Sequence, residues 1–233
     1  MSETIPLFSH SEAGWADSLL PARERRDASE NRARILAAAR ALMAEQGVAQ
    51  VSMADIALAA GVGKGTLYRR FANKGELCLL LLDENLRGHE QEMLALLQRL
   101  AGENAPYLAR LTRFLGQAAA FTGQHMALLV EVQQAGIAPD MAGIDPPYFS
   151  FQHMTVGGLL RAAQAAGEID AALDVEMLTD MLLAPLAPPY FRYLRQKRGY
   201  SVERIAAFLG QWVGQLVRPR MDAVARKESV KGE

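Results

Sequence analysis

The stretch SMADIALAAGVGKGTLYRRFANKGEL, from Ser52 to Leu77, decides the fold of the N-terminal part of this chain. It predicts two short helices joined by a tight turn, followed by the start of a third helix. Ser52 and Asp55 have the spacing of a capping box, which marks the beginning of a helix. Gly61 suits the left-handed conformation in which helices commonly end, and Gly63 can cap the second helix.

The second helix, predicted over residues 64–71, has one face that suits DNA. When its side chains are placed at about 100° per residue and Leu67 points to the core, most of the others fall on the outer half and the flanks. These are small, hydroxylated or basic, and none is a carboxylate: Lys64, Gly65, Thr66, Tyr68, Arg69 and Arg70. Such a face can approach the major groove and meet phosphates or guanine. The pattern indicates a helix-turn-helix, although periodicity alone leaves open an ordinary pair of helices with a solvated face.

The identities of the residues in this stretch are more informative than its periodicity. The stretch resembles the DNA-binding segment of the TetR family of bacterial transcriptional regulators. The positions that match are Ile56, Ala57, Ala60, Gly61, Val62, Gly63, Gly65, Thr66, Leu67, Tyr68, Phe71, Lys74 and Leu77. The resemblance covers about the second fifth of the chain. It implies an all-α fold, with an N-terminal three-helix helix-turn-helix domain that binds DNA and a larger C-terminal helical domain that binds a ligand and dimerises.

The resemblance also implies which side chains meet DNA. The residues expected to read or approach bases are Lys64, Gly65 and Thr66. Those expected to contact phosphates are Ser52, Tyr68 and Lys74. Arg69 and Arg70 stand where Tyr or His is more usual in the family, and they could reach either a base or a phosphate.

A third helix is predicted to begin after Asn73, which has capping-box spacing with Glu76. Lys74 then lies in the first turn, near the positive end of the helix dipole, where a cation is unfavourable. A phosphate nearby would remove that penalty. Gly75 replaces the acidic residue that is common at this position in the family, and we expect it to loosen the turn slightly.

Composition favours the same fold class. Half of the 233 residues are hydrophobic, Ala and Leu dominate, and no strand-like alternation persists, which favours an all-α protein. The net charge of −1 argues against a non-specific nucleic-acid binder. From Arg23 to Leu77 there are ten Lys and Arg against six Asp and Glu, a net charge of +4, and the rest of the chain carries −5. This distribution fits one DNA-facing domain on a body that does not face DNA.

Four segments are predicted along the chain. They are a flexible N-terminal arm (1–27), the helix-turn-helix domain (28–75), a ligand-binding and dimerisation domain (76–220) and a frayed tail (221–233). The first helix of the helix-turn-helix domain is expected over residues 29–46. The arginines at the end of the arm fit either a solvated helix start or a contact with a phosphate or the minor groove: Arg23, Arg25 and Arg26.

In the body, a long connecting helix is predicted from Glu76. Further helices are predicted over residues 106–122, 125–135, 148–166, 173–198 and 201–217, the fourth kinked near its prolines. The last two are apolar on more than one face and need burial on nearly all sides. They would either close the core of the monomer or bury against a second subunit. In the TetR family the last two long helices form a four-helix bundle between subunits, so the resemblance implies a homodimer through residues 174–217.

The resemblance further implies a small-molecule pocket in the body. Side chains that could line it for an apolar or aromatic effector are Met126, Glu131, Phe149, Phe151, His153, Met154, Met177 and Met181. Each of these could equally be plain core. No metal site is indicated, because no pair of histidines has HxH or HExxH spacing. No catalytic or cofactor-binding motif is found, and Cys78, in an apolar run, is expected to be buried and inert.

We therefore expect a ligand-responsive DNA-binding transcriptional regulator, most simply a repressor. It would bind a near-palindromic double-stranded DNA operator as a homodimer and be released by a small-molecule effector. No secretion signal or membrane span is visible, so the expected location is the cytoplasm. An activator, or a DNA-binding protein with no transcriptional role, stays open. The rival from another class is an all-α enzyme or carrier, against which the missing catalytic constellation argues.

Overall fold

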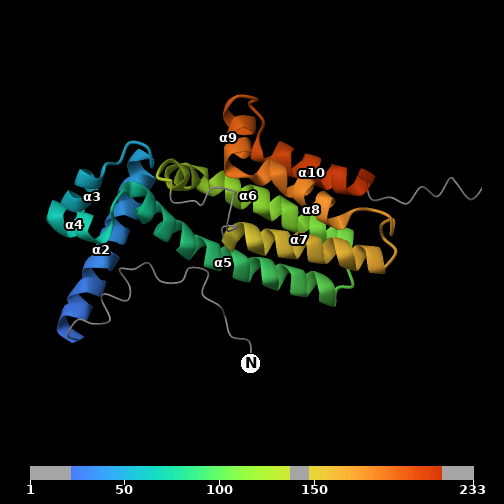
Figure 1. Ribbon diagram of the computed structural model, residues 1–233, viewed down its shortest axis with the longest axis horizontal. Coiled ribbons are helices and arrows are strands. Elements are labelled where there is room, and N and C mark those ends of the chain that lie inside the picture. Colours follow the sequence, from blue (N-terminus) through green and yellow to red (C-terminus); the bar gives the residue numbers. More distant parts are fainter. Residues whose placement is uncertain (1–21, 137–146, 217–233) are drawn as a thin grey trace, which may run out of the picture. The chain divides into compact units, whose positions relative to one another are not determined.

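The computed structural model describes residues 22–136 and 147–216, and every regular element in these two ranges is helical (Figure 1). The helices are α2 (Ala22–Gln46), α3 (Met53–Ala59), α4 (Lys64–Arg70), α5 (Lys74–Gly102), α6 (Tyr107–Gln134), α7 (Pro147–Ala165), α8 (Val175–Leu183), α9 (Pro188–Gln196) and α10 (Val202–Leu216). The expected all-α fold is confirmed. Most of the predicted arm and all of the predicted tail lie outside the described residues.

Three helix boundaries differ from the sequence predictions. α2 begins at Ala22, so the arginines assigned to the end of the arm lie on a helix. α6 continues through Gly123, where a break is predicted; a Cβ on Gly123 would lie only 2.6 Å from Val202 Cγ2, so this glycine permits close packing. The predicted kinked helix over residues 173–198 is two helices separated by a 3₁₀ turn, η2 (Ala184–Leu186). α9 starts with Pro188 because proline lacks the N–H that a helix interior needs.

The described residues form two compact units. The first holds residues 22–89, 124–136 and 147–150, and the second holds residues 90–123 and 151–216. α5 and α6 each contribute one part to each unit. The helix-turn-helix therefore shares its unit with the C-terminal part of α6.

The core of the first unit joins α2, α3 and α4 to the beginning of α5. Ile35 of α2, Ile56 of α3 and Leu67 of α4 are fully buried in one cluster. Val132 of α6 belongs to the same cluster. Leu67 is the buried side chain of α4, and burying one such side chain contributes about 1.5–3 kcal/mol. The orientation of this short helix therefore depends on Leu67.

The second unit has its own core and a capping contact between distant parts of the chain. Its largest fully buried side chains are Phe114, Phe191, Leu111, Leu115, Leu160, Leu182, Leu186 and Leu209. The carboxylate of Glu168, which follows α7, accepts hydrogen bonds from the amides of Tyr107 at 2.9 Å and Leu108 at 3.0 Å. These amides have no partner within α6 because they lie in its first turn. Glu168 therefore caps α6 and complements the positive end of its dipole.

A buried histidine, His89, and a half-buried one, His125, make the stability of the first unit depend on pH. Burial lowers the pKa of His89 in α5 to about 4, with a smaller effect of His125 in α6 in the same direction. Burial also lowers the pKa of His125. In the unfolded chain an imidazole titrates near pH 6.5. Between about pH 6.5 and pH 4 the unfolded chain binds more protons than the folded chain, so stability falls as the pH falls through this window.

We expect the midpoint of urea unfolding to drop when the pH is lowered from 7 to 5. The variant His89→Gln should show a smaller drop, because one of the depressed groups is absent. Unfolding followed by circular dichroism at several pH values measures both. A wild-type midpoint that stays constant over this range, or rises toward pH 5, would contradict the assignment.

Candidate nucleic-acid interface

α3 begins where the capping box predicts it. Ser52 Oγ accepts a hydrogen bond from the Asp55 amide at 3.2 Å, and the Ser52 amide donates to Asp55 Oδ2 at 2.9 Å. The Ser52 hydroxyl also donates to Asp55 Oδ2 at 2.6 Å. These hydrogen bonds from Ser52 lower the pKa of Asp55. Ser52 is exposed, but its hydroxyl is engaged within the protein, and its contact with a phosphate stays a prediction.

The turn between α3 and α4 depends on Gly61. This residue has a φ of +64°, a left-handed conformation that side chains disfavour. After it, the amide of Val62 donates to Ala57 O at 3.0 Å, which closes the end of α3. Gly63 then has an extended backbone and precedes α4 as its N-cap. The predicted helix-turn-helix is confirmed in each of these local features.

α4 presents an exposed face without carboxylates. Lys64, Gly65, Tyr68 and Arg69 are exposed, and Thr66 and Arg70 are half-buried. Within the described ranges no protein group bonds to the side chains of Lys64, Tyr68 or Arg69. A Cβ on Gly65 would meet no atom within 4 Å, so the backbone of α4 is open to a ligand there. The structure therefore brings together the residues that the sequence assigned to the recognition helix.

Lys74 is placed differently from the α4 side chains. Its Nζ atom lies 3.0 Å from the carbonyl oxygen of Val48 and 3.0 Å from Glu131 Oε1. The Lys74 and Glu131 side chains are only 19% and 17% exposed. Sequence reasoning places Lys74 at a phosphate and Glu131 in a pocket, but in the structure they are partners of each other. No sequence spacing signals this pair, because 57 positions separate the two residues.

The predicted pocket residues are divided between the two units, and their assignment to one pocket stays a prediction. Met154, Met177 and Met181 are exposed, by 67%, 57% and 46% respectively. His153 Nε2 lies 3.1 Å from Asp180 Oδ1. Phe151 contacts Phe114, with ring centroids 6.0 Å apart. Met126 is half-buried in the first unit, and the side chain of Phe149 lies outside the described residues.

Sequence reasoning missed Gln152, which lies in α7 next to Phe151. Its side chain is almost fully buried, and neither amide atom finds a hydrogen-bond partner in the described part of the chain. A buried amide without a partner is costly, so such groups usually bond to water or a ligand. No sequence signal singled it out, because Ser150, His153 and Thr155 are also polar in the same segment.

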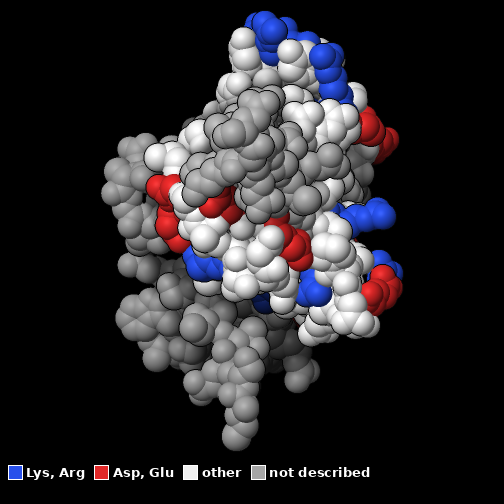
Figure 2. Space-filling model, turned by 90° about the vertical axis from the view of Figure 1, so that its right-hand side faces the viewer, with Lys and Arg blue, Asp and Glu red and all other residues white. Residues whose placement is uncertain are grey.

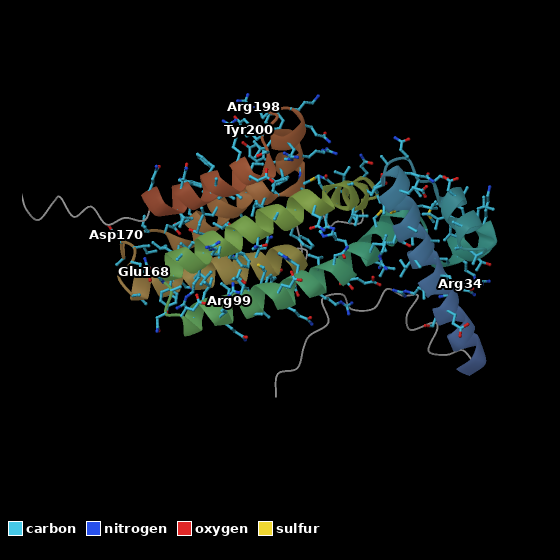
Figure 3. All side chains as sticks on the ribbon, turned by 180° about the vertical axis from the view of Figure 1, so that it is seen from behind. Arg34, Arg99, Glu168, Asp170, Arg198 and Tyr200 are labelled. Carbon is cyan, nitrogen blue, oxygen red and sulfur yellow. The ribbon has the colours of Figure 1, made fainter. Side chains whose placement is uncertain are left out.

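A second basic cluster lies at the tip formed by α9 and the segment that leads into α10. Figure 2 shows Lys and Arg side chains gathered at the top of the molecule, and Figure 3 labels Arg198 and Tyr200 there. The guanidinium of Arg204 lies 4.3 Å from the centroid of the Tyr200 ring, and Arg195 donates to Tyr200 O at 2.6 Å. Arg198 lowers the pKa of Tyr200 by a hydrogen bond. These cations are engaged locally, in contrast to Lys64 and Arg69 on α4.

Across residues 22–136 and 147–216, no three His, Cys, Asp or Glu side chains gather as a metal site requires. No helix in the same ranges combines the length and the apolar character that crossing a membrane demands. α3, the turn at Gly61 and α4 together form a helix-turn-helix.

Comparison with known proteins shows what the helix-turn-helix domain is similar to. Residues 35–81 match the family described as bacterial regulatory proteins, tetR family. The HTH-type transcriptional regulator SAUSA300_2515 of Staphylococcus aureus (strain USA300) is 47% identical over 62 residues, which are 27% of this chain and 34% of that protein. The chain therefore matches about a third of the length of this curated relative. Residues 35–81 therefore form a DNA-binding domain of the tetR type, and this match concerns only that part of the chain.

Solved structures show that the likeness in fold extends beyond this domain. A putative transcriptional regulator from Saccharomonospora viridis, in complex with choline, superposes with a TM-score of 0.58 and 22% identity over 82% of this chain and 100% of its own. FadR of Thermus thermophilus, a TetR-family transcriptional repressor in complex with lauroyl-CoA, has a TM-score of 0.57 and 20% identity over 82% of this chain and 97% of its own. At these identities the likeness concerns the fold.

The beginning of α5 approaches α6 closely at Gly75. A Cβ on Gly75 would lie 2.3 Å from Ala135 Cβ and 3.1 Å from Glu131 O. The sequence predicts only a slightly looser turn at this glycine. The structure instead uses the missing side chain to bring the two helices into contact within the first unit.

We expect Gly75→Ala to lower the free energy of unfolding by about 1–3 kcal/mol, because the added methyl group forces the two backbones apart. Gly88→Ala is the matched control: Gly88 is also in α5, but its Cβ would meet nothing within 4 Å. That variant should gain about 0.5–1 kcal/mol, since alanine favours a helix interior. Urea unfolding measures both, and equal stability of the two variants would contradict the close approach.

Proposed function

We propose that the chain is a ligand-responsive transcriptional repressor that binds a near-palindromic operator as a homodimer. The observation that carries the proposal is the exposed, carboxylate-free face of α4, held on a helix-turn-helix frame by the burial of Leu67. Lys64 and Arg69 have no protein partner in the described residues, so their positive charges are available to DNA. The basic N-terminal part of the sequence supports this assignment.

Contacts with bases and phosphates divide along α4. Lys64, Gly65 and Thr66 form its first turn, where a recognition helix enters the major groove. Tyr68, one turn further on, is 52% exposed and presents a phenol to a phosphate. Arg69 and Arg70 in the last turn extend the basic face and can reach a base or the backbone.

The dimer surface is assigned to α8 and α10 because each exposes apolar side chains one turn apart. On α8 these are Met177 and Met181. On α10 Phe208 is 62% exposed, and its ring stacks on that of Trp212 with centroids 6.5 Å apart. Leaving these side chains in water forgoes about 25 cal/mol for each Å² of apolar surface. A two-fold symmetric partner would cover them and would place two recognition helices on a palindrome.

The effector site is assigned to the second unit, next to Gln152. An effector with one polar group could bond to this buried amide while its apolar part meets aromatic side chains such as Phe151. Because Met177 and Met181 are exposed, we assign them to the dimer surface and not to the effector site. Ligands in two structures of the same fold, choline and lauroyl-CoA, support a ligand-responsive body. The effector would act by favouring a conformation of the dimer that binds the operator more weakly.

Selection from a random pool of duplex DNA tests the proposal. We expect a near-palindromic sequence to be recovered at physiological salt. Lys64→Ala should then weaken binding to that duplex by about 1–3 kcal/mol, and Tyr68→Ala should weaken it on all sequences alike. Arg99→Ala, on the exposed part of α5 in the second unit, is the matched control and should bind as the wild type does. Unchanged affinity of both α4 variants would contradict the interface.

Sedimentation velocity tests the dimer. We expect a wild-type dimer at micromolar concentration, and Phe208→Asp should shift it toward monomer because a carboxylate would be desolvated in the interface. Leu94→Asp, at an exposed leucine of α5, is the matched control and should leave the dimer intact. Monomeric wild-type protein, or a dimer insensitive to Phe208→Asp, would contradict the surface assignment.

A further inference from the structure

The ammonium of Lys74 joins three segments of the first unit. Lys74 is the first residue of α5, Val48 lies in the turn between α2 and α3, and Glu131 lies near the C-terminal end of α6. The two contacts, both 3.0 Å long, use two of the three N–H donors of the ammonium. The segment that leads into the helix-turn-helix is therefore tied to α6 through one side chain.

The surroundings of the ion pair are packed. Gly75, next to Lys74, lets α5 lie close to α6. A Cβ added to Gly75 would be only 3.1 Å from Glu131 O. Cys78 is fully buried one turn along α5. Burial raises the pKa of its thiol to about 12, and the Glu131 carboxylate adds to this effect. Val132, beside Glu131, is part of the core that also contains Leu67.

The helix dipole explains why Lys74 needs an anion. A cation in the first turn of a helix is unfavourable, and the sequence leaves a phosphate as the obvious compensation. In the structure Glu131 supplies the negative charge. Because both side chains are about four-fifths buried, removing one partner would leave the other as a poorly solvated charge.

We propose that Lys74 is a positioning residue, whose ammonium fastens the turn before α3 to α6 so that α4 is held in its DNA-binding orientation. This inference rests on the proposed function and concerns how the same interface is kept in place. Lys74 then affects DNA binding through Glu131 and Val48 instead of through a phosphate. A change in the C-terminal part of α6 would reach the recognition helix by the same link.

A double-mutant cycle on the selected duplex tests the proposal. The variants are Lys74→Met, Glu131→Gln and the double variant, with affinity measured over a series of salt concentrations. We expect each single variant to bind the duplex about 5–20-fold more weakly than the wild type. The double variant should bind no more weakly than the single variant with the lower affinity, because the two side chains act as a unit. The slope of log affinity against log salt should equal that of the wild type, since no phosphate contact is lost.

A charge exchange keeps the test independent of simple destabilisation. Lys74→Glu and Glu131→Lys alone each place like charges together, whereas the double exchange restores an ion pair. The double exchange should bind DNA more tightly than either single reversal. Thermal unfolding of all variants shows whether each remains folded at the temperature of the binding assay.

Three results would overturn the positioning role. One is a Lys74→Met variant whose salt slope falls by about one phosphate contact while Glu131→Gln binds as well as the wild type or better. Another is additive losses in the cycle. The third is a double exchange no tighter than Lys74→Glu. The α4 variant Lys64→Ala separates this from failure of the proposed function: if it too leaves binding unchanged, the interface itself is wrong.

Discussion

Burial of Leu67 is the contact on which the DNA-facing surface depends. α4 spans only seven residues from Lys64 to Arg70, and a helix this short is not stable by itself in water. It persists because Leu67 is inserted among side chains of α2 and α3. Phe71, the residue that follows α4, is buried as well. The exposed polar face exists as an ordered surface only while this apolar contact holds. The exposed basic side chains of α4 therefore depend on the core of the first unit, because that core fixes the orientation of α4.

The cations of the first unit fall into two kinds that composition does not distinguish. Lys64 and Arg69 lie on the surface without a protein partner among the described residues, whereas Lys74 is paired and largely buried. A surface cation exchanges water and counterions for a phosphate at little cost, which is the source of salt-dependent DNA binding. A buried cation would first have to leave its carboxylate. Equal charges in one sequence segment can therefore serve recognition and architecture separately.

Local chemistry explains which features the sequence predicted. The Ser52–Asp55 capping box, the left-handed Gly61 and the start of α4 after Gly63 each depend on neighbours within a few residues. The predicted helix end near Gly123 and the predicted helix start at residue 29 were both wrong. α6 continues through Gly123, and α2 begins seven residues earlier, at Ala22. In the sequence, Gly123 suggests the end of a helix. In the structure it packs against Val202, which comes from a distant part of the chain. The pocket assignment stays a prediction, because a methionine such as Met177 is equally apolar in a core, in a pocket or on a surface.

The sequence could not predict the ion pair between Lys74 and Glu131. The pair forms only because the fold brings these two distant residues together. Partly burying two charges costs desolvation energy that their attraction only offsets, so such pairs contribute little net stability and favour one arrangement over others. A hydrophobic pair of similar volume would hold α5 and α6 together with less directional preference. The proposed function requires the seven-residue helix α4 to keep one position, so discrimination between arrangements matters more for it than total stability. A directional contact that joins three segments, as Lys74 does with Val48 and Glu131, meets that requirement, which is the basis of the positioning role that we propose.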